Sequence, residues 1–231
     1  PSDTAWAGKT LHELEVETFL PKEWHKPIFE KAKELGIICF SSPFDLDAID
    51  FLEDLNCPAY KIASFEITDI ALIKKAALTK KPIILSTGIA NKEDIDLAVE
   101  TCLKVGNNQI VILKCTSSYP TSLEDVDLLS MNYLGKEYDC FYGLSDHTIG
   151  DLVAIGSVAL GASMIEKHFI LNSEVKSADA FFSMKPNDFK NMVEKIRKME
   201  LALGDQKWNI NQAMISGRKL SRSLFVTEDI N

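Results

Sequence analysis

Short runs of consecutive apolar residues alternate along this chain with segments of helical periodicity. Residues 109–113, Gln-Ile-Val-Ile-Leu, form the clearest of these runs. Strands that are apolar on both faces are typical of parallel sheets, because helices cover both sides of such a sheet. The alternation therefore predicts an α/β protein built from strand–helix units. Strands are expected at residues 37–40, 59–63, 82–85, 109–113, 139–142 and 162–165.

The strongest helical signals lie at residues 91–105. Apolar side chains recur there every three or four positions, which gives a helix one apolar face. Asn91 is a good N-cap with Asp94 three residues later, and Gly106 can take the left-handed conformation that closes a helix. Further helices are expected at residues 10–18, 21–35, 45–55, 69–79, 150–160 and 186–203, with a looser, partly helical stretch at 122–134.

Six strands of this type leave two architectures open. One is an open, doubly wound sheet, and the other is an eight-stranded barrel without its first strand–helix units. No Gly-x-Gly-x-x-Gly sequence follows a strand, which argues against a dinucleotide-binding open sheet. After residue 204 the chain becomes polar, and an apolar run at residues 223–227 is expected to begin another strand.

Composition argues against several classes of protein. The net charge of −9 and the pI near 5.0, with no long Lys/Arg run, argue against nucleic-acid binding. No apolar run approaches the ~18 residues that a membrane span needs, and residues 1–6 are not expected to be a signal peptide. The five cysteines form no Cys-x-x-Cys pair and are expected to be reduced thiols in a cytoplasmic protein.

Each predicted strand ends in hydroxyl, lysine or histidine side chains, and Lys114 is the lysine that follows residues 109–113. In a barrel the carboxyl ends of all strands open into one mouth, so these side chains would converge. Several hydroxyls with one or two cations suit a phosphate or a carboxylate, although any single serine can instead cap a helix or close a turn. Lys61 lies inside an apolar strand, where burial without a partner is costly, and a bound anion is the partner we expect.

Two of the four histidines, His147 and His168, follow the last two predicted strands. An acidic residue precedes each of them by one or two positions. A hydrogen-bonded core histidine is the alternative in each case. Two neutral imidazoles with water or substrate oxygens suit Mn²⁺, Mg²⁺ or Fe²⁺ better than structural zinc, which takes four protein ligands. We therefore expect a divalent metal at this pair.

Several short motifs together resemble the sialic acid synthases, the bacterial enzymes that make nonulosonic acids. These motifs are Phe40-Ser-Ser-Pro-Phe44, Tyr60-Lys-Ile-Ala-Ser-Phe-Glu66, Leu85-Ser-Thr-Gly88, Cys115-Thr-Ser-Ser-Tyr-Pro-Thr121, Gly143-Leu-Ser-Asp-His-Thr148 and Glu166-Lys-His-Phe169. They cover nearly the whole chain and occur in the family's order. Within the family, Trp24-His-Lys-Pro27 and Ala63-Ser-Phe-Glu66 are most similar to the pseudaminic acid branch.

The resemblance implies a TIM (β/α)₈ barrel. Residues 1–204 would contain strands three to eight, and the first two βα units would be absent. Residues 205–222 would form a linker, and residues 223–231 would begin a C-terminal antifreeze-like (SAF) domain. The full-length enzyme would be a homodimer in which that domain reaches the partner's active site.

The resemblance also implies the residues of the metal and phosphoenolpyruvate sites. His147 and His168 would hold the divalent metal, Mn²⁺ or Mg²⁺. Lys61 and Glu66 would be catalytic residues. The phosphoenolpyruvate site would comprise Ser42, Lys61, Ser64, Ser86, Ser117 and Ser145.

Glu66, Tyr119 and Asp179 match family positions that face the sugar substrate. Two departures from the N-acetylneuraminate enzymes stand nearby. Ser117 replaces an Asn, and the loop at residues 175–179 differs from their Gly-Pro-Asp form, which is consistent with a different sugar.

The implied reaction condenses phosphoenolpyruvate with an open-chain acetamido-sugar aldehyde, giving a nine-carbon sugar such as pseudaminic acid and phosphate. N-acetylneuraminate and legionaminate synthesis are alternatives within the family. A condensation with a sugar phosphate would need extra basic residues, and few stand at the strand ends. A module that binds phosphate without turnover is the alternative outside enzymes.

Overall fold

The computed structural model describes residues 8, 10–172, 174–175, 177–205, 207, 209–222, 224–225 and 227–229. Its strands are β1 (Tyr60–Ile62), β2 (Ile83–Ser86), β3 (Ile110–Cys115), β4 (Phe141–Asp146) and β5 (Met164–Lys167). They form one parallel sheet in the order β1-β2-β3-β4-β5, so each strand pairs with the next one along the chain. Parallel neighbours require a crossover, and helices provide most of these crossovers, as the sequence predicts.

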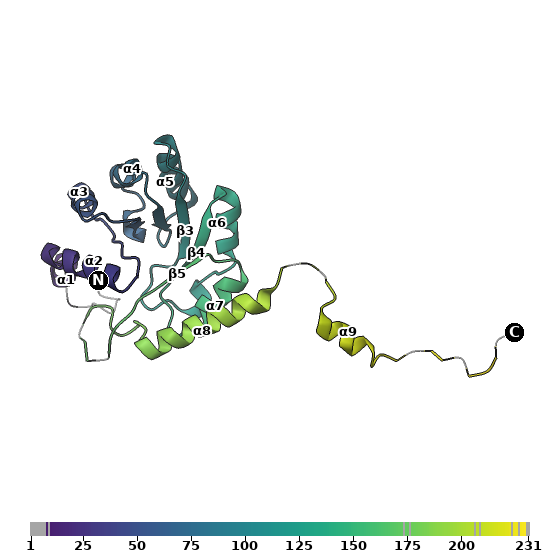
Figure 1. The fold of residues 1–231 in the computed structure, drawn as a ribbon. Coiled ribbons are helices and arrows are strands. Elements are labelled where there is room, and N and C mark those ends of the chain that lie inside the picture. Colours follow the sequence, from purple (N-terminus) through teal and green to yellow (C-terminus); the bar gives the residue numbers. More distant parts are fainter. Residues whose placement is uncertain are drawn as a thin grey trace.

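The helices up to residue 203 form an outer layer around the sheet, and one further helix lies beyond them (Figure 1). They are α1 (Leu11–Thr18), α2 (Lys22–Glu34), α3 (Leu46–Asp54), α4 (Ile70–Leu78), α5 (Lys92–Lys104), α6 (Ser130–Tyr138), α7 (Leu152–Ala159), α8 (Pro186–Leu203) and α9 (Gln212–Arg218), with 3₁₀ turns η1 (Ser64–Glu66) and η2 (Leu123–Asp125). The predicted start of α5 is confirmed, because Asn91 and Asp94 cap each other's backbone N–H groups. Gly106 closes that helix with φ +73°.

The sheet is strongly curled. In a flat sheet, four strand spacings of about 4.8 Å would hold β1 and β5 roughly 19 Å apart. Yet Lys61 Nζ of β1 lies 3.5 Å from Glu166 Oε2 of β5. The two edge strands therefore face each other across a concave surface, and the fold is a half-barrel of the TIM type.

Alternate residues of each strand face the helices or the concave side. The helix-facing residues, including Tyr60, Ile62, Leu85 and Ile112, form the main core with buried side chains of α3, α4 and α5. Each fully buried side chain of this size contributes roughly 1.5–3 kcal/mol. Gly143 allows β4 and β5 to approach closely, since a Cβ there would lie 2.0 Å from the carbonyl oxygen of Met164. The strand residues between these core positions face the concave side, where the candidate site lies.

The strand expected at residues 37–40 is wrong. Only an isolated bridge between Ser41 and Tyr60 joins this segment to the sheet, so five strands form instead of six. Ile37 is 61% exposed and Ile38 is 77% exposed. A strand requires a ladder of successive backbone pairs, and a single bridge does not form one, whatever the apolar character of the segment.

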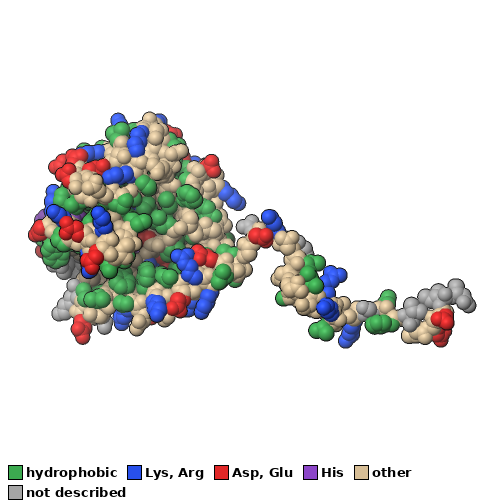
Figure 2. Space-filling model, in the orientation of Figure 1, with side chains coloured by type: hydrophobic (Ala, Val, Ile, Leu, Met, Phe, Trp, Pro, Cys, Tyr) green, Lys and Arg blue, Asp and Glu red, His purple; other side chains and the backbone are tan. Residues whose placement is uncertain are grey.

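The chain beyond α8 leaves the folded body as an extended segment that contains α9 (Figures 1 and 2). The sequence did not predict this helix. Leu224 and Phe225, within the strand expected at residues 223–227, are not in a strand. Ser223 and Val226 lie outside the described residues. None of the described helices has both the length and the apolar character that crossing a bilayer requires.

Candidate active site

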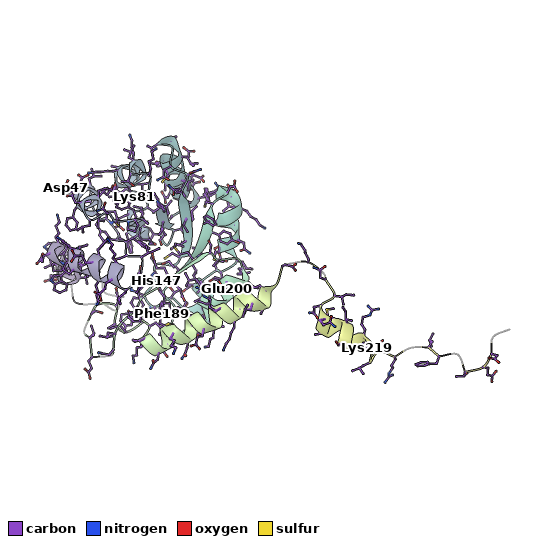
Figure 3. The ribbon with its side chains drawn as sticks, in the orientation of Figure 1. Asp47, Lys81, His147, Phe189, Glu200 and Lys219 are labelled. Atoms are coloured by element: carbon purple, nitrogen blue, oxygen red, sulfur yellow. The ribbon has the colours of Figure 1, made fainter. Side chains whose placement is uncertain are left out.

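The carboxyl ends of the five strands bring the predicted site residues to the concave side of the sheet. Lys61, Ser86, Cys115, Ser145 and Glu166 occupy alternate, inward-facing strand positions, and strand pairing places Cys115 beside Ser145 and Ser145 beside Glu166. Their alternation with the core residues explains how apolar strands can carry polar side chains into one mouth. Figure 3 shows His147 in the middle of the folded body.

His147 and His168 meet one residue beyond the ends of β4 and β5. Their ring centroids are 5.2 Å apart, and the planes cross at 64°. Two further aromatic rings cover them. The Tyr119 ring lies 4.4 Å from the His147 ring, and the Phe182 ring lies 4.7 Å from the His168 ring.

Each histidine has its Nδ1 atom against a protein oxygen. His147 Nδ1 lies 3.0 Å from the carbonyl oxygen of Thr116, which can only accept, so this nitrogen carries the proton. His168 Nδ1 lies 3.4 Å from Asp179 Oδ2. In the neutral rings the lone pairs therefore lie on the Nε2 atoms. A metal-binding histidine has this arrangement, with its other nitrogen held by a carbonyl or carboxylate.

The surroundings of His147 favour its charged form. Burial disfavours a charge, but the Cys115 thiol and the Thr116 carbonyl outweigh it and raise the pKa of the imidazole. Cys115 Sγ lies 3.9 Å from His147 Nδ1. Burial likewise disfavours a thiolate at Cys115, yet hydrogen bonds with His147 and Ser64 lower the pKa of that thiol.

Three hydroxyls gather at the ends of β1, β2 and β3. Ser64 Oγ accepts a hydrogen bond from the Gly88 N–H at 3.0 Å and donates one to Cys115 Sγ at 3.4 Å. Ser86 is 1% exposed, and among the described residues its Oγ has no hydrogen-bond partner. A Cβ at Gly88 would lie 2.1 Å from Ser117 Oγ and 2.7 Å from Ser64 Oγ. The absence of a side chain at Gly88 thus makes the room for this polar cluster.

Lys61 has a partner within the protein. Its ammonium lies 3.5 Å from Glu166 Oε2, while Glu166 Oε1 accepts a 2.6 Å hydrogen bond from Ser145 Oγ. The sequence predicts a bound anion as the partner of Lys61 and does not reveal this carboxylate within the protein. The negative charge of Glu166 also contributes to the raised pKa of His147.

Residues 1–208 match the family model described as the NeuB family. The chain belongs to the NeuB family. It is 51% identical to a pseudaminic acid synthase of Helicobacter pylori over 98% of this chain and 67% of that protein. It is 43% identical to a pseudaminic acid synthase of Campylobacter jejuni over 97% of this chain and 66% of that protein. The chain spans about two thirds of the length of these relatives.

A solved structure supports the same placement. The fold of this NeuB-family chain matches that of an N-acetylneuraminic acid synthetase from Leptospira borgpetersenii, crystallised with citrate, with a TM-score of 0.85 and 27% identity. The match covers 92% of this chain and 75% of the solved one. The resemblance inferred from the motifs is confirmed at the level of the family.

The remaining predicted residues of this NeuB chain lie around the same mouth. Ser42 is half-buried and directly follows Ser41, whose carbonyl accepts a 3.2 Å hydrogen bond from the Lys61 N–H. Glu66 is half-buried in η1, just after β1. Tyr119 and Asp179 both contact the histidine pair, the first by ring packing and the second through Nδ1 of His168. Lys176, in the loop expected to contact the sugar, lies outside the described residues.

One strand-end lysine does not join the mouth. Lys114 was expected to converge with the other polar side chains, but it occupies a helix-facing position of β3. It lines a groove of about 220 Å³ between α5 and α6, together with Thr87, Lys92 and Tyr133. Burial lowers the pKa of its ammonium. Strand alternation explains the difference, because Lys114 precedes the inward-facing Cys115 by one position.

Sequence reasoning missed three contributors to the site. Glu166 was noted only as an acidic neighbour, although it pairs with Lys61 across the sheet. Cys115 was considered only as a buried thiol, although it lies between Ser64 and His147. Phe182 was not considered at all. A motif places residues along the chain but does not reveal which residue of another strand they will meet.

Proposed function

We propose that this chain is the barrel part of a pseudaminic acid synthase, which condenses phosphoenolpyruvate with an open-chain acetamido-sugar aldehyde and releases phosphate. The observation that carries the proposal is the meeting of Lys61, the serine cluster and the two histidines at one sheet end. Its support also includes the 51% identity to the Helicobacter pylori enzyme. Synthesis of N-acetylneuraminic or legionaminic acid at the same site is the second candidate, because a legionaminic acid synthase of Legionella pneumophila is 38% identical.

The anionic substrate suits the hydroxyl cluster. Lys61 provides a buried cation on β1, and Ser64, Ser86 and Ser117 provide neutral donors at the ends of β1, β2 and β3. The buried Ser86 hydroxyl, which has no hydrogen-bond partner in the described part of the chain, is a donor ready for a ligand oxygen. Ser42 and Ser145 complete the proposed phosphoenolpyruvate site. One positive charge together with several neutral hydroxyl donors favours a phosphate or carboxylate over a neutral ligand.

The histidine pair suits a divalent metal such as Mn²⁺ or Mg²⁺. Both Nδ1 atoms are held by oxygens, so both Nε2 lone pairs remain for coordination. Among the described residues, no group of three or more His, Cys, Asp or Glu side chains forms a metal cage. The other ligands would therefore be water or substrate oxygens. A metal bound there supplies Lewis-acid polarisation of the aldehyde oxygen.

The reaction forms one carbon–carbon bond and one carbon–oxygen bond from water, breaks the carbon–oxygen bond to phosphate, and protonates the former aldehyde oxygen. C3 of phosphoenolpyruvate attacks the aldehyde carbon, positive charge develops at C2, water adds to C2 and loses a proton, and phosphate leaves from the tetrahedral intermediate. Lys61 and the serines hold the phosphate and align the alkene with the aldehyde. Glu66 lies at the same rim and is the proposed proton-handling residue of this chain, while Tyr119 and Asp179 contact the sugar.

The proposal includes a larger protein. Two βα units would complete the half-barrel to eight strands, with the segment at residues 37–40 paired as the third strand. Residues 205–222 would link the barrel to an SAF domain starting at residues 223–231, and the enzyme would be a cytoplasmic homodimer. The exposed Ile37 and Ile38 are consistent with a missing neighbour at that edge of the sheet.

Phosphate release by the full-length protein tests this function. The protein would be mixed with phosphoenolpyruvate, Mn²⁺ and, in turn, the pseudaminic acid precursor, the legionaminic acid precursor and N-acetylmannosamine. We expect fastest release with the first sugar, none after treatment with EDTA, and recovery when Mn²⁺ or Mg²⁺ is returned. His147→Ala and His168→Ala should abolish metal-dependent turnover.

Three results would change the conclusion. Fastest release with another sugar would move the assignment within the family. Binding of phosphoenolpyruvate without release, whatever the sugar, would indicate a module without turnover. Unchanged turnover and metal binding in both histidine variants would overturn the metal site.

A further inference from the structure

A buried ion pair lies directly behind the two histidines. Lys167 Nζ donates to Asp146 Oδ2 at 2.7 Å, and these side chains are only 2% and 1% exposed. The pair joins the last paired residues of β4 and β5, which the sheet register places side by side. Each member immediately precedes a histidine. The ion pair faces the helices, while the next residue of each strand turns into the mouth.

Thr148, the residue after His147, forms hydrogen bonds with both members of this ion pair. Asp146 Oδ1 accepts hydrogen bonds from Thr148 N at 2.8 Å and from Thr148 Oγ1 at 2.7 Å. Lys167 Nζ also donates to the Thr148 carbonyl oxygen at 2.5 Å. His147 is thus enclosed between two residues that bond to each other and to β5.

Two backbone hydrogen bonds from other segments also hold the carbonyl groups of the two histidines. Thr121 N donates to the carbonyl oxygen of His147 at 3.1 Å, and Met184 N donates to that of His168 at 2.8 Å. With both carbonyls held, the relation between the two rings depends on how the two strand ends are joined. Among the described residues, Lys167 joins them at that point through its bonds to Asp146 and Thr148, one position beyond the Ser145–Glu166 hydrogen bond.

We propose that Asp146, Lys167 and Thr148 are positioning residues, which set the separation and orientation of the His147 and His168 rings and so define the metal site. The inference rests on the proposed function for its metal, but the ring geometry it explains does not. An apolar pair could fill the same space, yet it would lack the directional bonds that hold Thr148 and both strand ends in one arrangement. The interactions among Asp146, Lys167 and Thr148 are therefore expected to affect metal affinity more than folding.

The test uses full-length protein carrying Asp146→Leu with Lys167→Met, which removes both charges and leaves neither one buried alone. A milder pair, Thr148→Val and Thr148→Ser, removes the hydroxyl or keeps it with little change in shape. The matched control is Asp151→Asn with Lys195→Met, which removes a more exposed ion pair between α7 and α8. Electron paramagnetic resonance titration gives the Mn²⁺ Kd, and thermal melting reports folding.

A second measurement needs no metal. Long-range ¹H–¹⁵N spectra of the imidazoles report the tautomer and order of each ring, and substitution of His147 or His168 assigns its signal. At a pH where the rings are neutral, wild-type His147 and His168 should each show a single protonated-Nδ1 form. The double variant should show averaged tautomers at both rings, and the control should match wild type.

We expect the double variant to bind Mn²⁺ about 10- to 100-fold more weakly, the range typical when groups that orient a metal ligand are removed. Thr148→Val should shift the Kd in the same direction, and Thr148→Ser should restore it. A folded double variant with wild-type Kd and wild-type ring spectra would overturn the proposal. If the double variant does not fold, the two Thr148 variants decide by the same criteria.

Failure of the proposed function would look different. If wild-type protein binds no Mn²⁺, the metal assignment is wrong, and the ring spectra alone then decide the positioning role. Disordered rings in the double variant would support it, and ordered, unchanged rings would overturn it.

Discussion

Lys61 and Glu166 stand on the first and last strands of the sheet, yet their charged atoms lie 3.5 Å apart. The two side chains meet over the concave face of the sheet, although their strands are not neighbours in it. Lys61 lies on the strand that ends just before Ser64, and Glu166 lies on the strand that ends just before His168. A phosphate or carboxylate that binds Lys61 would have to share the lysine with Glu166 or displace it.

Lys61→Met should weaken the enzyme more than it weakens the fold. The variant leaves Glu166 without its cation, but the Glu166 side chain is 38% exposed, so water offsets part of the loss. We expect about 1–3 kcal/mol of destabilisation and a fall of at least about 100-fold in kcat/KM for phosphoenolpyruvate. Lys104→Met, which removes an exposed helical pair with Glu100, is the control. Wild-type kinetics in Lys61→Met would contradict the assignment.

Gly88→Ala should disturb the hydroxyl cluster. The new methyl would meet Ser117 Oγ at 2.1 Å, Ser64 Oγ at 2.7 Å and Cys115 Sγ at 2.9 Å, so several side chains must move. We expect a loss of about 1–3 kcal/mol in denaturant unfolding, together with weaker phosphoenolpyruvate binding by calorimetry. Gly217→Ala in α9, where a Cβ meets nothing within 4 Å, should be neutral or slightly stabilising. Equal behaviour of the two variants would rule out the steric explanation.

Tyr119 should separate packing from sugar binding. Its ring lies 4.4 Å from that of His147, and burial raises the pKa of its phenol. Tyr119→Phe keeps the ring that covers the histidines, so Mn²⁺ affinity should stay within about twofold while the KM for the sugar rises. Tyr119→Ala should weaken both, because a buried aromatic group is lost. Steady-state kinetics and metal titration of both variants check this, and an unchanged sugar KM in Tyr119→Phe would remove the hydroxyl from the sugar site.

Glu53 should give the fold a pH-dependent contribution. Burial alone would raise the pKa of this carboxyl, but hydrogen bonds from Lys81 and Tyr60 outweigh it and lower the pKa. A lowered pKa in the folded state means that the stabilisation is present above the unfolded pKa of about 4.3 and is lost as the pH falls through the folded value. Because the carboxyl is partly exposed, we expect only about 0.5–1 kcal/mol.

Urea unfolding of wild type and Glu53→Gln across pH 7 to 3 measures this contribution. The difference in unfolding free energy should be constant near neutrality and disappear in the acid range. Glu34→Gln, which affects an exposed pair with Lys31, serves as the control. A difference that grows as the pH falls would have the wrong sign.

Local sequence signals settled most of the secondary structure. The capping box at Asn91 and the left-handed Gly106 depend only on neighbours along the chain, and both were predictable. The strand predicted at residues 37–40 does not form, because strand formation depends on pairing with residues distant in the sequence. Its apolar side chains fit a strand, but a strand also needs a partner on the sheet, and the residues themselves do not provide one.

The sequence by itself determined the strand–helix alternation, the polar strand ends and the family, because these are properties of residues close together in the chain. Tertiary structure decided which of those polar ends share a site. The curl of the sheet brings Lys61 to Glu166, strand alternation turns Lys114 away from the mouth, and strand register sets Asp146 against Lys167. Each outcome depends on the relative placement of different strands, and that placement is fixed only when the whole sheet and its helices pack together.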